Sequence, residues 1–135
     1  MKRDAVDRFT ELLLREAEMS LKMVIAPYSG FEVGAAIASV SGKIYTGCNI
    51  ENHSLMLSIC AEKVALFKAL SEGERFFRSI AIVSGDRRYC FPCGSCRQVL
   101  WEFTKDIDIF LSGEKGIKRY SLSELLPYPF SKEIA

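Results

Sequence analysis

The chain has 135 residues, 49% of them hydrophobic and 26% charged, and its formal net charge is +1. This length predicts one domain spanning residues 1–135, which is large enough to bury a core without disulfide bonds. The composition excludes collagen-like and disordered chains. No apolar run is long enough to span a membrane. The balanced charge argues against binding to nucleic acid.

The first third of the chain predicts a helix followed by a hairpin. Apolar residues recur at helical spacing over residues 4–24, and Pro27 follows, so we expect an amphipathic helix that ends before it. Residues 31–40 and 43–48 are two apolar runs separated by Ser41-Gly42, which is typical of an antiparallel hairpin. The charged residues 1–7 do not resemble a secretion signal, so we expect a cytoplasmic protein.

Helices and strands alternate over the rest of the chain. Hydrophobic periodicity predicts helices at 60–70 and 93–103, and short apolar runs predict strands at 79–84, 107–111 and 117–120. The strand at 79–84 is apolar without alternation, which is typical of a strand covered on both faces. These elements follow the order expected of an α/β protein.

A capping box marks the start of a short last helix. Ser121 and Glu124 stand at the required spacing, and Pro127 ends the segment. Strands that alternate with helices after an opening hairpin predict an α/β fold, a three-layer α/β/α sandwich around a mixed five-stranded sheet.

Three cysteines and one glutamate indicate a zinc site with an open position. Cys60 and Glu62 lie in Cys-Ala-Glu, and Cys93 and Cys96 lie in Pro-Cys-Gly-Ser-Cys, each at the predicted start of a helix. Helix N-termini stabilise thiolates. Three protein ligands leave one position for water, which zinc activates, and Glu62 is a nearby proton acceptor. This is the pattern of a catalytic zinc site.

Other interpretations of the cysteines remain open at this point. Cys90, Cys93 and Cys96 form a Cys-x-x-Cys-x-x-Cys run. Together with Cys60, this run can hold an iron–sulfur cluster or a structural zinc ion bound by four thiolates. Buried structural thiols are a further alternative. His53 is the single histidine, and a loop histidine is usually solvated, so it is left out of the predicted site.

From about Ala26 to Phe130 the chain resembles the small, homotetrameric, zinc-dependent cytidine deaminases. The resemblance implies a cytidine deaminase-like fold with Zn²⁺ bound by Cys60, Cys93 and Cys96, and with Glu62 as the acid and base. It also implies a hydrolase acting on C–N bonds of cyclic amidines, assembled as a homotetramer with shared active sites.

The same resemblance implies a set of substrate-binding residues. Asn49 and Glu51, in Gly-Cys-Asn-Ile-Glu-Asn, match the segment that binds the sugar hydroxyls. Phe31 matches the aromatic residue that packs against the pyrimidine ring, and Ala61 is also assigned to substrate binding. Phe130 matches an aromatic residue that a neighbouring subunit contributes.

Two basic residues beside the motifs are expected to tune the charge of the site. Three thiolates on a divalent ion leave a net charge of about −1, which nearby cations offset. Lys63 and Arg97 stand next to the cysteine motifs. Lys63 departs from the family pattern, which usually has arginine there, and Leu55 stands where the family commonly has tyrosine.

The expected reaction is hydrolytic deamination of cytidine and 2′-deoxycytidine to uridine and 2′-deoxyuridine with release of ammonia, in pyrimidine salvage. The expected partner is a small pyrimidine nucleoside, because no basic stripe is present to follow a polymer. The alternatives are deamination of a nucleoside analogue such as blasticidin S and, in a different class, a non-catalytic metal-binding or iron–sulfur module.

Overall fold

A computed structural model describes residues 6–132 and shows a mixed sheet in the order β2-β1-β3-β4-β5. The first three strands in this order pair antiparallel, β3 and β4 pair parallel, and β4 and β5 pair antiparallel. The mixed five-stranded sheet is confirmed. Its strands are β1 (Val33–Ser39), β2 (Ile44–Cys48), β3 (Phe77–Ser84), β4 (Asp108–Gly113) and β5 (Gly116–Ser121).

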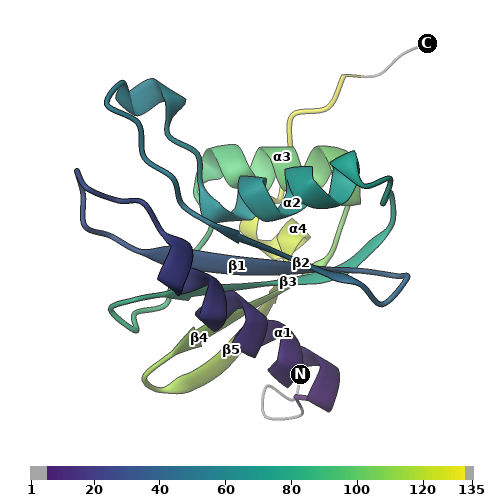
Figure 1. Cartoon of the computed structure of the whole chain (residues 1–135). Coiled ribbons are helices and arrows are strands. Elements are labelled where there is room, and N and C mark those ends of the chain that lie inside the picture. Colours follow the sequence, from purple (N-terminus) through teal and green to yellow (C-terminus); the bar gives the residue numbers. More distant parts are fainter. Residues whose placement is uncertain (1–5, 133–135) are drawn as a thin grey trace.

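Helices cover both faces of the sheet, which confirms the three layers (Figure 1). The helix α1 lies on one face, and α2 and α3 lie side by side on the other, where α4 also packs. The helices are α1 (Arg8–Met19), α2 (Ala61–Ser71), α3 (Gly94–Thr104) and α4 (Leu122–Leu125), with short 3-10 turns η1 (Ser20–Met23) and η2 (Leu55–Leu57).

Alternate residues of β1 pack into two different apolar clusters. Ala35 and Ile37 belong to the cluster under α2 and α3, whereas Ala36 and Ala38 belong to the cluster under α1. All seven residues of β1 are buried, as expected for a central strand with its two faces covered. The core therefore lies in two layers, with β1 between them.

Glycine brings α2 close to the sheet. A Cβ atom at Gly47 in β2 would overlap the carbonyl oxygen of Ala61 and would lie 2.5 Å from the amide nitrogen of Ala65. The sheet and the first turn of α2 are thus in main-chain contact. This contact fixes the start of the helix that follows Cys60.

The first helix is shorter than the sequence predicts. Asp7 caps it by accepting a hydrogen bond from Thr10 N at 2.8 Å, and α1 ends at Met19 instead of continuing to Val24. Ser20 Oγ donates both to Ala17 O and, at 2.9 Å, to Gly47 O on β2. This long-range bond accompanies a change to a 3-10 turn, which local periodicity cannot reveal. Residues 4 and 5 of the predicted helix lie outside the described residues.

Candidate active site

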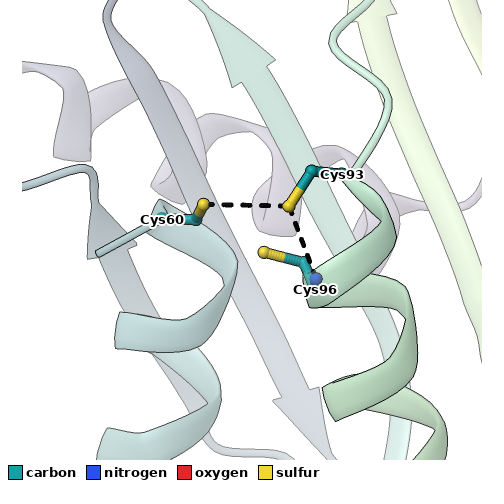
Figure 2. A group of neighbouring side chains, drawn as sticks. All are labelled: Cys60, Cys93 and Cys96. Carbon is teal, nitrogen blue, oxygen red and sulfur yellow. Dashed lines mark hydrogen bonds between the residues drawn. The ribbon is translucent and has the colours of Figure 1, made fainter. Parts of the chain in front are cut away.

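Three cysteine sulfurs meet where the N-termini of α2 and α3 converge (Figure 2). Cys60 is the residue before α2, Cys93 is the residue before α3, and Cys96 lies in the first turn of α3. Their Sγ atoms all lie within 4.8 Å of one another, and Cys60 Sγ and Cys93 Sγ are 4.0 Å apart. Tetrahedral zinc with Zn–S bonds of about 2.3 Å needs sulfur separations of about 3.8 Å. The three cysteines therefore fit zinc.

Neither Cys90 nor His53 joins this group of sulfurs. Among residues 6–132, the group of possible metal ligands comprises Cys60, Cys93 and Cys96 alone. Burial raises the pKa of the Cys90 thiol to about 12. His53 Nδ1 lies 3.2 Å from Tyr28 Oη instead. This geometry favours three protein ligands over a closed four-thiolate site or an iron–sulfur cluster.

The pKa values of the neighbouring Cys60 and Cys96 thiols shift in opposite directions. The neighbouring Cys96 thiol is the largest influence on Cys60, and the pKa of Cys60 falls to about 6 although burial opposes the change. The pKa of Cys96 rises because the neighbouring Cys60 and burial favour its protonated form. The cluster thus already contains one readily ionised sulfur, as expected of a group that can bind a cation.

Glu62 lies beside the cysteines and is almost completely buried. Its side chain is in the first turn of α2, with only 4% of the residue exposed. Burial is the main reason that the pKa of Glu62 rises to about 7, and the neighbouring Cys60 adds to the effect. A carboxyl group with this pKa can both accept and donate a proton near neutral pH.

Cys60, Cys93 and Glu62 line a pocket of about 240 Å³. This volume is slightly below the usual range of small-molecule sites, about 300–1,000 Å³. The pocket brings together most of the residues that the sequence predicts for substrate binding. Its lining consists of Ser29, Phe31, Val33, Asn49, Glu51, Cys60, Ala61, Glu62, Cys90, Phe91 and Cys93.

Asn49 and Glu51 hold the loop that carries Phe31. Asn49 Oδ1 accepts from Val33 N at 2.9 Å, and its Nδ2 donates to Phe31 O at 2.8 Å. The carboxylate of Glu51 accepts from the amide and the hydroxyl of Ser29, and these bonds lower the pKa of Glu51. These bonds favour the ionised form of Glu51, and its carboxylate can accept a further hydrogen bond from a hydroxyl group.

The two basic residues have different partners. Lys63 Nζ donates to Ser95 Oγ at 2.6 Å, and the positive charge of Lys63 contributes to the low pKa of Cys60. Arg97 instead donates to the main-chain oxygens of Pro92 and Leu125, both at 2.7 Å. Arg97 thus braces the loop before α3, a contact that the sequence did not predict.

Phe130 lies outside the pocket of its own chain. It is 74% exposed and does not contribute to the lining. Its main chain is held by Gln98 of α3, whose Nε2 donates to Phe130 O at 2.8 Å and whose Oε1 accepts from Phe130 N at 3.0 Å. The structure therefore fixes the main chain at Phe130 and leaves the ring available.

Sequence reasoning missed four lining residues, Ser29, Val33, Cys90 and Phe91. Ser29 lies two residues before Phe31, and Cys90 and Phe91 directly precede the Pro-Cys motif. Proximity to the motifs was the available signal. It did not show which of these side chains turn towards the pocket.

Comparison with known proteins agrees with this site. The family model described as the cytidine and deoxycytidylate deaminase zinc-binding region matches residues 7–111. A cytidine deaminase from Sporosarcina psychrophila is 42% identical over 91% of this chain and 92% of its own length. One from Halalkalibacterium halodurans is 43% identical over 91% of this chain and 95% of its own length.

A solved structure gives the same result. The crystal structure of cytidine deaminase from Burkholderia pseudomallei is 40% identical, with a TM-score of 0.84 over 89% of this chain and 98% of that one. A blasticidin-S deaminase from Bacillus cereus is more distant, at 29% identity over 74% of this chain and 77% of its own length. The chain belongs to the zinc-binding cytidine and deoxycytidylate deaminase family.

Among residues 6–132, none of the helices combines the length and the apolar character needed to cross a bilayer.

Proposed function

We propose that the protein catalyses hydrolytic deamination of cytidine and 2′-deoxycytidine, with uridine or 2′-deoxyuridine and ammonia as products. The observation that carries this proposal is the buried Glu62 in the same pocket as Cys60 and Cys93. The relatives named cytidine deaminases, similar over nearly the whole chain, support the choice of substrate. The residues 1–135 would then act as a single catalytic domain.

The metal ligands in this proposal are Cys60, Cys93 and Cys96. Zinc held by them would supply an activated water near neutral pH. Glu62 would take a proton from the attacking water and deliver it to ring nitrogen N3, which makes C4 electrophilic. Glu62 would then pass the second proton of the water to the exocyclic nitrogen, which leaves as ammonia. A carboxyl group whose pKa burial raises to about 7 can both take up and release a proton near neutral pH, as these transfers require.

The other residues that line the pocket would hold the nucleoside. Phe31 supplies an apolar surface for the pyrimidine, and Asn49 and Glu51 would bind the sugar hydroxyls. Glu51 suits this task because its ionised carboxylate is an acceptor only. Ala61 lines the pocket next to Glu62, where its small side chain leaves room for the base.

We propose a homotetramer in which Phe130 enters the active site of a neighbouring subunit. Phe130 is exposed and does not line its own pocket, so contact with a substrate requires a second copy. The apolar residues of η2, Leu55, Met56 and Leu57, are also strongly exposed, as expected of an interface. Leu55 would then lie in this contact in place of the tyrosine common in the family.

A cytoplasmic role in pyrimidine salvage fits the chemistry of the chain. All five cysteines are free thiols, which persist in reducing compartments. The product of the proposed reaction is a uracil nucleoside that can re-enter nucleotide synthesis. Lys63 and Arg97 would offset the negative charge of the three thiolates, Lys63 directly and Arg97 at a greater distance.

A substrate panel tests the proposal. Zinc-loaded protein is mixed with cytidine, 2′-deoxycytidine, cytosine, adenosine or blasticidin S, and loss of the amino group is followed by absorbance and ammonia release. We expect turnover of the two cytosine nucleosides. If blasticidin S alone were turned over, the substrate would be this nucleoside analogue and not cytidine. If no compound were turned over, the result would favour a non-catalytic metal-binding module.

A further inference from the structure

Phe91 is an aromatic residue of the pocket to which the family resemblance assigns no role. It lies in the loop between β3 and α3, directly between Cys90 and Pro92. Phe91 is 41% exposed, and it lines the pocket that also contains Phe31 and Glu62. An apolar ring left open to a pocket gains contact area when a ligand covers it.

The loop that carries Phe91 is held on both sides. On one side, Tyr89 Oη donates to Gly116 O at 3.0 Å. On the other, Pro92 O accepts from Arg97 Nε at 2.7 Å, and Pro92 itself is fully buried. Because both anchors are in place before any ligand binds, little entropy is lost in positioning Phe91.

A second aromatic ring supports Phe91 from the sheet. The ring centroids of Phe91 and Tyr120 lie 5.3 Å apart, with the planes inclined at 55°. Tyr120 belongs to β5 and packs against the main apolar cluster. The ring of Phe91 is therefore backed by the sheet, and its open surface borders the pocket.

We propose that Phe91 is a specificity-determining residue that contacts the bound nucleoside and, together with Phe31, gives the pocket two apolar walls. This inference rests on the proposed function, because it concerns the substrate of that same site. Contact with Phe91 favours flat, uncharged heteroaromatic rings over ligands with charged or strongly hydrated groups at that position. Tyr120 acts through Phe91 and is a positioning residue.

The test compares Phe91→Ala with Phe103→Ala, a matched control on α3. Phe103 is 44% exposed and does not line the pocket. KM and kcat are measured for cytidine, and the Kd of the product uridine is measured by calorimetry on zinc-loaded protein. We expect Phe91→Ala to raise KM and Kd by about five- to tenfold with kcat changed less than about twofold, because an aromatic contact contributes about that much to binding. Phe103→Ala should change none of these values.

Two further variants separate binding from folding. Phe91→Leu keeps apolar bulk without the ring, so it should raise KM by about two- to fourfold even if Phe91→Ala fails to fold. Tyr120→Phe, which keeps the supporting ring, should behave as wild type, and Tyr120→Ala should raise KM by less than Phe91→Ala does. Each protein is checked for one zinc per chain before it is compared.

The outcomes distinguish this inference from the proposed function. Wild-type turnover of cytidine with unchanged KM and Kd in both Phe91 variants would overturn the inference and leave the proposed function intact. A fall in kcat at unchanged KM would also overturn it, because Phe91 would then act on the metal loop and not on the ligand. Wild-type protein that neither turns over cytidine nor binds uridine would overturn both.

Discussion

Lys63 Nζ donates a hydrogen bond to Ser95 Oγ at 2.6 Å, and this bond joins the first turns of α2 and α3. These are the two turns that bring Cys60 together with Cys93. A single lysine thus places a positive charge beside the sulfurs and ties together the helices that present them. Lysine offers a compact point charge at this position, whereas arginine would offer a planar fork.

Loss of the Lys63 charge should weaken metal retention. We expect Lys63→Met to lower zinc affinity by roughly tenfold, since groups that support metal ligands typically contribute 10- to 100-fold. Competition with a chromogenic chelator measures the affinity. Lys68→Met, on the same helix but bonded to Thr46 O, is the matched control and should keep wild-type affinity. Equal affinities for Lys63→Met and wild type would contradict this role of Lys63.

Gly47 should not tolerate a side chain. A Cβ atom there would overlap Ala61 O and press on Ala65 N, so Gly47→Ala must push α2 away from the sheet. We expect a loss of about 1–3 kcal/mol in the free energy of unfolding, the usual cost of overpacking. Denaturant unfolding at a fixed zinc concentration measures it. Gly94→Ala is the control, because a Cβ there meets nothing within 4 Å; an equal loss in both variants would show that close packing is not the cause.

The sequence motifs were sufficient to predict the cysteine cluster that can hold a metal ion. Cys60, Cys93 and Cys96 lie at the starts of two helices, and the short spacing of Cys93 and Cys96 places these two in the same first turn. The partners of Asn49 and Gln98 could not be predicted in this way. Each binds main-chain atoms 16 or 32 residues away, so its partner depends on how the chain folds.

The same distinction applies to the fold. Alternating helices and strands were sufficient to predict the layers and the mixed sheet, because periodicity is a local property. The end of α1 was predicted too late because Ser20 is bonded to Gly47, 27 residues along the chain. Arg97 likewise was expected to act through its charge, and its contact with Leu125 O depends on the position of α4, 28 residues along the chain.

Gln98 should affect the activity on cytidine by holding Phe130 in place. The paired hydrogen bonds between Gln98 and the main chain of Phe130 hold the C-terminal segment on α3. We expect Gln98→Leu and Phe130→Ala each to lower kcat/KM for cytidine by about tenfold, and the double variant to be no worse than either one, because both changes remove the same contribution. Additive losses in this double-mutant cycle would contradict the coupling.

Gln98→Glu gives a second comparison at this position. Its carboxylate can still accept from Phe130 N but cannot donate to Phe130 O. The loss of activity should therefore lie between those of wild type and Gln98→Leu. Limited tryptic cleavage at Lys132 should be faster in Gln98→Leu than in wild type, and equal cleavage rates would show that the bonds do not hold the segment.

The stabilisation that the ionised carboxylate of Asp86 provides should be lost in acid. Its carboxylate accepts from the side chain and the amide of Arg88 and from Ser84 Oγ, and these bonds lower the pKa of Asp86 from 3.8 to about 2. A lowered pKa means that this stabilisation is fully present above about pH 4 and is lost as the pH falls through about 2. Asp86→Asn should therefore be less stable than wild type at pH 7, and the difference should narrow over that window.

Thermal unfolding of the two proteins between pH 7 and pH 2.5 measures this difference. Zinc release in acid affects both proteins alike, so the comparison isolates the carboxylate. The pH 7 difference in Tm serves as the internal reference. A difference that stays constant down to pH 2.5 would show that ionisation of Asp86 does not stabilise the folded state.

The most direct test of the account is the turnover of cytidine by zinc-loaded Glu62→Gln. Glu62 is buried and burial raises its pKa, so the neutral, equally sized glutamine should fold and bind one zinc per chain. Glutamine cannot carry the proton from water to the base, and we predict that kcat falls by at least about 100-fold. A variant that retains zinc and more than about a tenth of the wild-type kcat would contradict the proposed role of Glu62.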